Sequence, residues 1–200
     1  MRQRGFTLVE LIVTITVLAM ILAMAMPTVA NWTGNTRIRN VADSLQNGLQ
    51  IARAEAVRRN QRMSFWLVAV GDPTTLSNDC TLSSTSGSWV VSINSPVGHC
   101  ADAPSTTSSP MLVTGRASGG GITVAAFQAD NATAGMAVTF DGFGRIAPTA
   151  GAGTIGFINV TGATGSVNLS IVVSPGGLVR MCDPRVTDTK DPRLCVPPSP

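Results

Sequence analysis

Hydrophobic and polar positions divide the N-terminal part of the chain into two helical halves of different character. Residues 6–26 carry a single charge, Glu10, and a helix of this length is about 30 Å long, which matches the hydrocarbon core of a bilayer. From residue 38 onward, apolar residues recur three and four positions apart, which is the period of a helix with one buried face. These residues are Ile38, Val41, Ala42, Leu45, Leu49, Ala52 and Ala56. The pattern predicts a membrane-spanning half over residues 6–27 and an amphipathic half over residues 28–61.

The two halves are expected to form one helix from Phe6 to about Arg59. Pro27 lies where they join and predicts a kink, because proline has no N–H to donate to the helical hydrogen-bond pattern. Glu55 precedes Arg59 by four residues, which is the spacing of a favourable exposed ion pair. Asn60 is a residue type that often follows the last helical turn. The amphipathic half therefore needs a surface on which to pack.

The rest of the chain, residues 62–200, has the pattern of a β-rich domain. Eight short runs rich in β-formers are separated by glycine, proline and aspartate turn signals. The runs are 63–70, 89–93, 111–114, 122–127, 136–140, 154–160, 167–173 and 178–181. One long helix followed by many short strands predicts an α+β fold, in which an antiparallel sheet wraps the amphipathic half-helix.

The four cysteines, at positions 80, 100, 182 and 195, allow three disulfide pairings. An N-terminal anchor would place the domain outside the cytoplasm, where disulfides persist. We favour Cys80–Cys100 and Cys182–Cys195, because each closes a short local loop. The first pair would close an exposed excursion flanked by the loop-like segments 74–88 and 101–110, for which a partner-contact surface is the alternative interpretation. A zinc site of Cys80, His99 and Cys100 is a further alternative, but the paired C-x-x-C spacing typical of zinc is absent.

Charge and composition favour neither an enzyme nor a nucleic-acid-binding protein. The net charge of +3 falls to +1 without Arg2 and Arg4, so the pI near 9.0 partly reflects these two residues. The single histidine, His99, has no evident nucleophile or carboxylate partner, and no glycine-rich phosphate loop opens a helix. We therefore expect no catalytic residue, no cofactor and no metal.

The N-terminus combines a basic leader that ends at Gly5, an apolar Phe6, and Glu10 at the fifth position after Gly5. A carboxylate inside an apolar helix costs a few kcal/mol or more, so it is usually functional. A secretory signal would be cut after the apolar run, where Ala23-Met24-Ala25 is a loose match, but it would leave Glu10 unexplained. A plain membrane anchor explains the length of the run and neither Glu10 nor the leader.

These residues resemble the start of type IV prepilins and of type II secretion pseudopilins. The resemblance implies that residues 1–5 are a leader, which prepilin peptidase removes between Gly5 and Phe6, and that Phe6 is then N-methylated. It also implies an anchor in the bacterial inner membrane, with the domain in the periplasm, followed by assembly with other pilins into an extracellular filament. In such filaments the residue matching Glu10 pairs with the N-terminal amine of a neighbouring subunit.

Three further segments resemble the GspH/FimT family: residues 52–61 at the helix end, residues 140–145, and residues 176–182. The family implies a pilin-like fold, with the long helix packed on a β-rich domain. The C-terminal cysteine pair resembles the minor pilins of the FimT and FimU type, which implies a non-catalytic subunit that helps initiate or cap a type IV pilus and so serves twitching motility. The alternatives are a minor pseudopilin of the GspH type, in type II secretion, and a DNA-binding minor pilin for natural transformation.

DNA binding would use a Gly-Arg-containing basic motif near the C-terminus in this family. The matching place has Leu178 where the motif has arginine, although Arg180, Arg185, Lys190 and Arg193 are candidate phosphate contacts. Aspartates at positions 183, 188 and 191 interleave with these cations, and no aromatic residue follows Met181. A solvated tail with local ion pairs is therefore the favoured interpretation.

Overall fold

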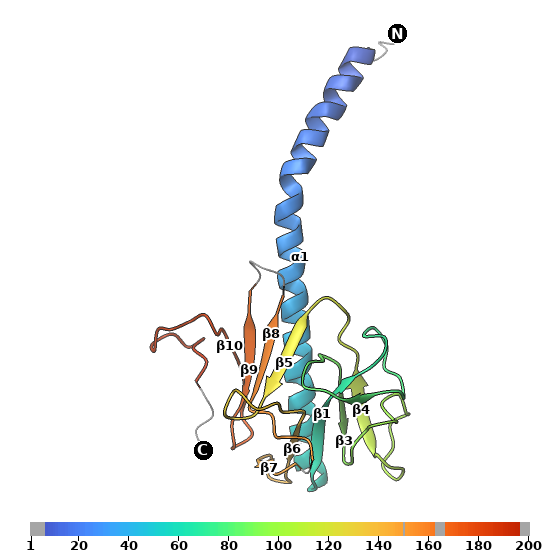
Figure 1. Cartoon of the computed structure of the whole chain (residues 1–200), viewed down its shortest axis with the longest axis vertical. Coiled ribbons are helices and arrows are strands. Elements are labelled where there is room, and N and C mark those ends of the chain that lie inside the picture. Colours follow the sequence, from blue (N-terminus) through green and yellow to red (C-terminus); the bar gives the residue numbers. More distant parts are fainter. Residues whose placement is uncertain (1–6, 150, 163–166, 197–200) are drawn as a thin grey trace.

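A single helix longer than the domain itself dominates the structure, which is a computed structural model. The structure describes residues 7–149, 151–162 and 167–196, without the side chains of residues 24–31. Helix α1 spans Leu8–Arg59, 52 residues or about 78 Å. Its N-terminal half extends away from the domain, and its C-terminal half lies among the strands (Figure 1).

The ends of α1 are capped by the residue types that helices commonly use. The Thr7 hydroxyl accepts the backbone N–H of Glu10 at 3.3 Å. At the other end Asn60 adopts the left-handed conformation (φ 49°), and the N–H of Gln61 donates to the carbonyl of Ala56, so the helix ends where the sequence predicts. The backbone is helical through Pro27, and the axis bends above the domain (Figure 1). The kink assigned to Pro27 stays a prediction, because its side chain lies outside the described residues.

The apolar stripe of the C-terminal half of α1 is the centre of the hydrophobic core. All seven residues of the predicted stripe are at most 6% exposed. Gly48 lies on the same face, where a Cβ atom would be 2.8 Å from ring atoms of Phe65 and Trp89. Trp89 also donates its indole N–H to the Ser44 hydroxyl at 3.0 Å. A glycine and a small hydroxyl residue thus let two large rings pack directly on the helix backbone.

In the described part of the chain, ten strands surround this half of the helix. They are β1 (Met63–Ala69), β2 (Thr81–Leu82), β3 (Trp89–Ser92), β4 (Leu112–Arg116), β5 (Thr123–Phe127), β6 (Ala137–Phe140), β7 (Ile146–Ala147), β8 (Phe157–Thr161), β9 (Leu169–Val173) and β10 (Val179–Cys182). Each of the eight predicted runs overlaps one of them. The two-residue strands β2 and β7 were not predicted.

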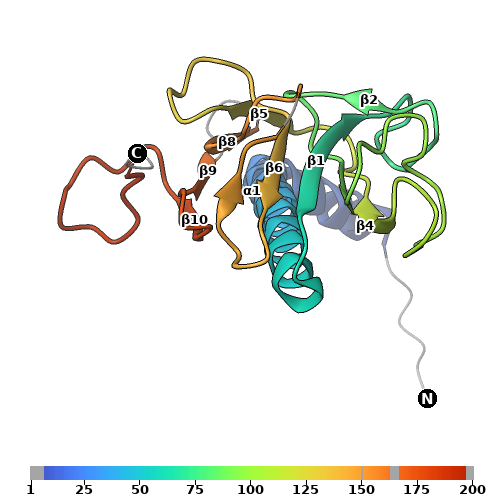
Figure 2. The same cartoon turned by 90° about the horizontal axis from the view of Figure 1, so that it is seen from below.

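The strands form two antiparallel sheets rather than the one sheet that the sequence predicts. One has the order β4-β3-β1-β6-β7, with β2 paired to β1, and the other has the order β10-β9-β8-β5. Seen from below, both curve around α1 and contribute to one core (Figure 2). The helix is therefore covered by two small sheets, each of which buries the face that it turns toward α1.

Two disulfides fasten the segments that leave these sheets. Cys80 is bonded to Cys100 and Cys182 to Cys195, which are the two local pairings that the sequence favours. The first pair belongs to a second apolar cluster, with Trp66 and Val90, on the face of β1 and β3 turned away from the helix. The two sulfurs of the alternative zinc site are thus bonded to each other and are not available as thiolate ligands.

Candidate assembly surfaces

The N-terminal half of α1 presents a large apolar surface outside the domain. Eleven large apolar side chains between Leu8 and Leu22 are each 51–73% exposed. At the helical period of 3.6 residues these positions lie on all sides of the helix. No strand of the domain lies beside this half of α1 (Figure 1). Soluble monomers rarely expose a contiguous apolar patch of more than a few hundred Å². This surface therefore needs a cover of lipid or of other apolar helices.

The polar groups of this half-helix are arranged so that its surface stays apolar. The hydroxyls of Thr14 and Thr16 donate to the carbonyls of Leu11 and Val13, at 2.8 and 2.9 Å, so they need no partner outside the helix. The carboxylate of Glu10 is exposed and is the one charged side chain described between residues 7 and 23. Gly5 and Phe6 lie outside the described residues, so their roles in cleavage and methylation stay predictions, as does that of Glu10.

Among the described residues, no helix meets the length and hydropathy expected of a membrane span. The predicted span, 6–27, includes Phe6 and the side chains of residues 24–27, which lie outside that set.

At the far end of the domain, the three sequence segments with family-like patterns meet in space. Arg53, from the helix end, donates its Nε–H to the carbonyl of Gly144 at 3.0 Å, although 91 residues separate them. Gly177 packs so closely here that a Cβ atom on it would lie 1.8 Å from the same carbonyl oxygen. Gly142 lies similarly close to Asn60. A Cβ atom on Gly142 would be 2.5 Å from the Oδ1 of Asn60. Glycines thus allow two loops to close directly onto the end of α1.

The loop between β6 and β7 is organised by Asp141. Its carboxylate accepts the backbone N–H groups of Phe143 and Arg145, both at 2.9 Å, and the backbone N–H of Arg145 does most to hold the pKa of Asp141 below its ordinary value. Phe143 is left 78% exposed, with the Arg145 guanidinium 5.3 Å from its ring centroid. The Arg145 guanidinium also pairs with the Asp141 carboxylate at 3.4 Å, so the loop is a turn closed by a charge pair.

The helix end carries a three-member charge cluster instead of the simple exposed pair that the sequence predicts. Glu55 accepts hydrogen bonds from Arg58 at 2.6 Å and from Arg59 at 2.7 Å, and its side chain is only 19% exposed. The hydrogen bond from Arg58 is the largest influence on the carboxylate and lowers the pKa of Glu55, and Arg59 lowers it further against the opposing effect of burial.

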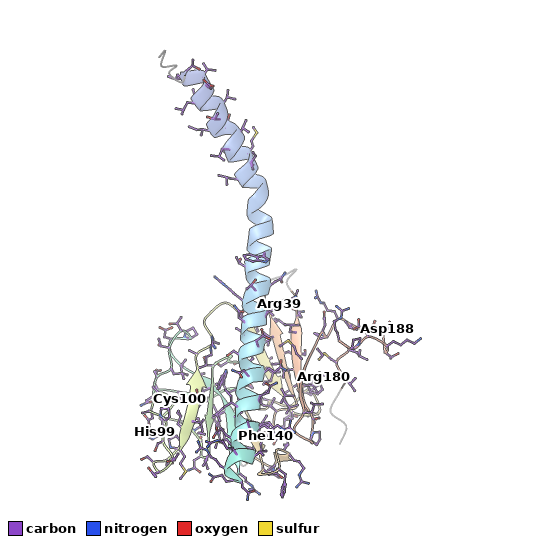
Figure 3. The ribbon with its side chains drawn as sticks, turned by 180° about the vertical axis from the view of Figure 1, so that it is seen from behind. Arg39, His99, Cys100, Phe140, Arg180 and Asp188 are labelled. Carbon is purple, nitrogen blue, oxygen red and sulfur yellow. A yellow bond between two sulfur atoms is a disulfide. The ribbon has the colours of Figure 1, made fainter. Side chains whose placement is uncertain are left out.

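The expectation that His99 has no carboxylate partner is wrong. His99 lies in the excursion closed by Cys80–Cys100. Its Nδ1 lies 2.8 Å from the carboxylate of Asp102, so the histidine has a carboxylate partner after all. Asp102 also accepts a hydrogen bond from the Asn78 amide, which does most to lower the pKa of its carboxyl, and His99 adds to the effect. His99 is 56% exposed and lies on a loop at one side of the domain (Figure 3). None of these contacts is with a nucleophile, so the His99–Asp102 pair serves to stabilise the loop.

Arg180 and the tail residue Asp188 lie on the opposite side of the domain from this excursion (Figure 3). Arg180 donates to the carbonyl of Leu194 at 3.0 Å and so ties the tail to β10. Arg185 is paired with Asp183 at 3.3 Å and Arg193 with Asp191 at 2.7 Å.

The tail repeats one small unit three times. An aspartate carboxylate accepts the N–H of a basic residue two positions on, in Asp183-Pro184-Arg185, Asp188-Thr189-Lys190 and Asp191-Pro192-Arg193, at 2.8–3.0 Å. The N–H of Arg185 does most to lower the pKa of Asp183, and the Arg193 guanidinium does most to lower that of Asp191. Each of the three cations thus has a carboxylate two residues before it, which weakens the positive potential that a phosphate backbone requires.

Comparison with known proteins now identifies the chain. The family described as Type II transport protein GspH matches residues 41–177, and the prokaryotic N-terminal methylation motif matches residues 1–26. The chain belongs to the GspH family. The GspH family consists of pilin-like structural subunits and not of enzymes. Among proteins of curated function, none matches the sequence.

Two solved structures are similar to this GspH-family chain, both of the type IV minor pilin FimU from Pseudomonas aeruginosa. The P21 crystal form has 14% sequence identity and a TM-score of 0.47, and the match covers 75% of this chain and 91% of that one. The P65 form has 16% identity and a TM-score of 0.43, with 72% and 90% covered.

The GspH match includes all the groups that meet at the end of α1. Arg53, Asn60, Gly142, Gly144 and Gly177 all lie within residues 41–177. The Cys182–Cys195 loop and its cations lie beyond the matched residues. Each of the three segments is recognisable in the sequence separately, but no pattern in the sequence indicates the Arg53 hydrogen bond that joins two of them.

Proposed function

We propose that this GspH-family protein is a minor type IV pilin, a non-catalytic subunit that helps to initiate or cap pilus assembly. The observation that carries the proposal is the division of α1 into a half that packs on the domain and a half whose eleven large apolar side chains are exposed. Such a surface is stable in lipid before assembly and among the apolar helices of other pilins afterwards.

In this proposal, prepilin peptidase removes residues 1–5 and Phe6 becomes the methylated N-terminus. The N-terminal methylation motif over residues 1–26 supports this step. The subunit first resides in the inner membrane with its domain in the periplasm, and it then enters an extracellular pilus. Glu10 pairs there with the N-terminal amine of a neighbouring pilin, and such a buried pair serves mainly to fix the register of the subunits.

The test is to replace Glu10 with alanine and with glutamine in the natural host. Both variants should be cleaved and retained in the membrane but should lower piliation and twitching, since neither can pair with an amine. Thr16→Ala is the matched control, because Thr16 is on the same exposed half-helix and its hydroxyl bonds only to the Val13 carbonyl. Normal piliation with both Glu10 variants would refute the assigned role.

A type II secretion pseudopilin is the second candidate, and the family's own description as a transport protein favours it. Deletion of the gene separates the two functions. A pilin mutant should lose surface pili and twitching and should keep exoprotein secretion, whereas a pseudopilin mutant should show the reverse.

DNA uptake is the third candidate. It is the least favoured, because Arg185 and Arg193 already pair with aspartates of the same tail. If the four C-terminal cations do bind DNA, changing Arg180 and Arg185 to glutamine should weaken a gel shift at low salt. Without a shift for the unmutated protein, this function would be excluded.

A further inference from the structure

Trp32 occupies a distinctive position between the apolar half of α1 and the domain. Its side chain is 68% exposed, whereas Trp66 and Trp89 are 6% and 3% exposed in the domain. The domain begins just beyond it, since the Asn35 side-chain oxygen accepts the N–H of Val167 at 2.8 Å and Ile38 is the first helix residue described as buried. Trp32 is thus at the upper boundary of the domain without belonging to its core.

The nearest charged residues on the two sides of this part of the helix are Glu10 and Arg37. No charged residue lies between Glu10 and Arg37, an interval of 26 uncharged residues, or about 39 Å of helix. A bilayer is about 30 Å thick in its hydrocarbon core and about 40–45 Å including its headgroup layers. Glu10 and Arg37 are therefore far enough apart to lie in opposite headgroup layers.

The residues at the domain's end of this interval suit a lipid headgroup layer. Tryptophan prefers the boundary between hydrocarbon and headgroups, where its ring is in an apolar environment and its N–H is hydrated. Arg37 and Arg39 follow within two turns and are both exposed, and Figure 3 places Arg39 where α1 enters the domain. The first carboxylate after Glu10 is Asp43, about 9 Å further along the helix from Arg37, so the boundary itself is cationic.

We propose that Trp32, with Arg37 and Arg39, binds the phospholipid headgroup layer on the domain's side of the membrane and sets the depth of α1 in the bilayer. The inference rests on the membrane stage of the proposed function. Trp32 follows Glu10 by 22 residues, or about 33 Å of helix. With Trp32 at one edge of the hydrocarbon core, Glu10 lies at or beyond the other edge, where its carboxylate is hydrated. This removes most of the cost of a charge at the membrane centre.

The test uses the full chain in vesicles of phosphatidylethanolamine and phosphatidylglycerol. Fluorescence is quenched by brominated lipids that carry bromine either near the headgroup or near the end of the acyl chain. Trp66 and Trp89 also fluoresce, and the Trp32→Phe variant measures their signal alone. Subtracting that signal gives the fluorescence of Trp32. We expect the Trp32 signal to be blue-shifted and to lose more intensity to the shallow label than to the deep one. A protein with Arg37→Gln and Arg39→Gln should shift this preference toward the deep label.

Spin labels on introduced cysteines measure the depth of the rest of the helix, since the native cysteines are in disulfides. A label at Leu8→Cys should be relaxed by a water-soluble nickel chelate, and a label at Ile21→Cys, midway between Glu10 and Trp32, should be protected from it. Strong quenching of Trp32 by aqueous iodide would overturn the proposal and leave this ring free to contact other subunits. Preferential quenching by the deep label, or protection at Leu8→Cys, would overturn it as well. A chain that fails to float with the vesicles would instead refute the membrane stage, and with it the proposed function.

Discussion

Gly177 offers the sharpest test of how the domain closes onto the end of α1. In Gly177→Ala, the new Cβ would lie 1.8 Å from the carbonyl oxygen of Gly144, which is a backbone atom and has no flexible side chain to move aside. Gly177 also has φ +79°, and the left-handed region costs a residue with a Cβ atom about 1–2 kcal/mol. Any shift that relieves the clash moves the acceptor of the Arg53 hydrogen bond, which contributes about another 1 kcal/mol. We expect a total loss of about 3 kcal/mol or more, from a stability that is typically about 5–15 kcal/mol.

Two other glycines separate the cost of the clash from the cost of the left-handed backbone conformation. Gly176→Ala should change stability by less than about 0.5 kcal/mol, because no atom lies within 4 Å of its Cβ position and its φ is not in the left-handed region. Gly98→Ala should cost about 1 kcal/mol, since Gly98 shares φ +79° with Gly177 and has open space around it. The difference between Gly177→Ala and Gly98→Ala measures the close approach to Gly144 alone.

The assay is urea and thermal unfolding of the full chain in detergent, followed by the fluorescence of the buried Trp66 and Trp89. A loss of about 3 kcal/mol corresponds to a fall in Tm of about 6–12 °C for a chain of this size. In a double-mutant cycle, Arg53→Ala should cost less in the Gly177→Ala background than in the wild type, because the hydrogen bond is already displaced. Equal stability of the Gly177→Ala and Gly98→Ala proteins would refute the contact argument.

Three further predictions follow from other contacts. Ser44→Ala leaves the indole N–H of Trp89 unpaired and should cost about 1–2 kcal/mol, which urea unfolding measures. Replacing Cys182 and Cys195 together by serine opens a loop with a sequence separation of 13 and should cost about 3 kcal/mol by the same assay. The lowered pKa of Glu55 means that its contribution is present above the unfolded pKa of about 4.3 and is lost as pH falls through the folded value, so Glu55→Gln should flatten stability against pH below about 5.

Each of the three has a result that would contradict it. Ser44→Ala is matched by Ser86→Ala, whose hydroxyl serves only a local turn, and equal stability of the two would exclude a role for the indole bond. For the disulfide, equal free energies of unfolding for the oxidised wild type and the double serine variant would exclude a stabilising role for Cys182–Cys195. For Glu55, an acid-side slope that is the same in wild type and Glu55→Gln would show that other carboxylates account for it.

The sequence predicts those elements whose signal is periodic and local. The stripe from Ile38 to Ala56 repeats at helical spacing, and one helix face buries all of it. Eight strands were predicted because each is at least four residues long and lies in a run rich in β-forming residues. Strands β2 and β7 have only two residues, and a segment that short has no period to detect.

The division into two sheets depends on contacts that no local pattern encodes. Strand β1 is apolar except for Ser64, and six of its seven residues are buried. The structure shows the reason, since α1 covers one face and the excursion closed by Cys80–Cys100 covers the other. A strand covered on both faces loses the alternation that would have shown which side faces the helix.

The sequence alone determined that this protein has a long helix with an apolar first half, and it determined where Glu10 lies within that half. Which groups meet at the other end of the helix depends on how the rest of the chain folds onto it. Arg53 and Gly144 are 91 residues apart, and their contact requires two loops of glycine-dependent shape to arrive at the same point. Local ion pairs in the C-terminal tail were predicted from the sequence and are present, whereas the hydrogen bond from Arg180 to the carbonyl of Leu194 became visible only in the folded chain. Periodicity is a property of neighbouring residues, whereas these contacts depend on how distant segments are brought together.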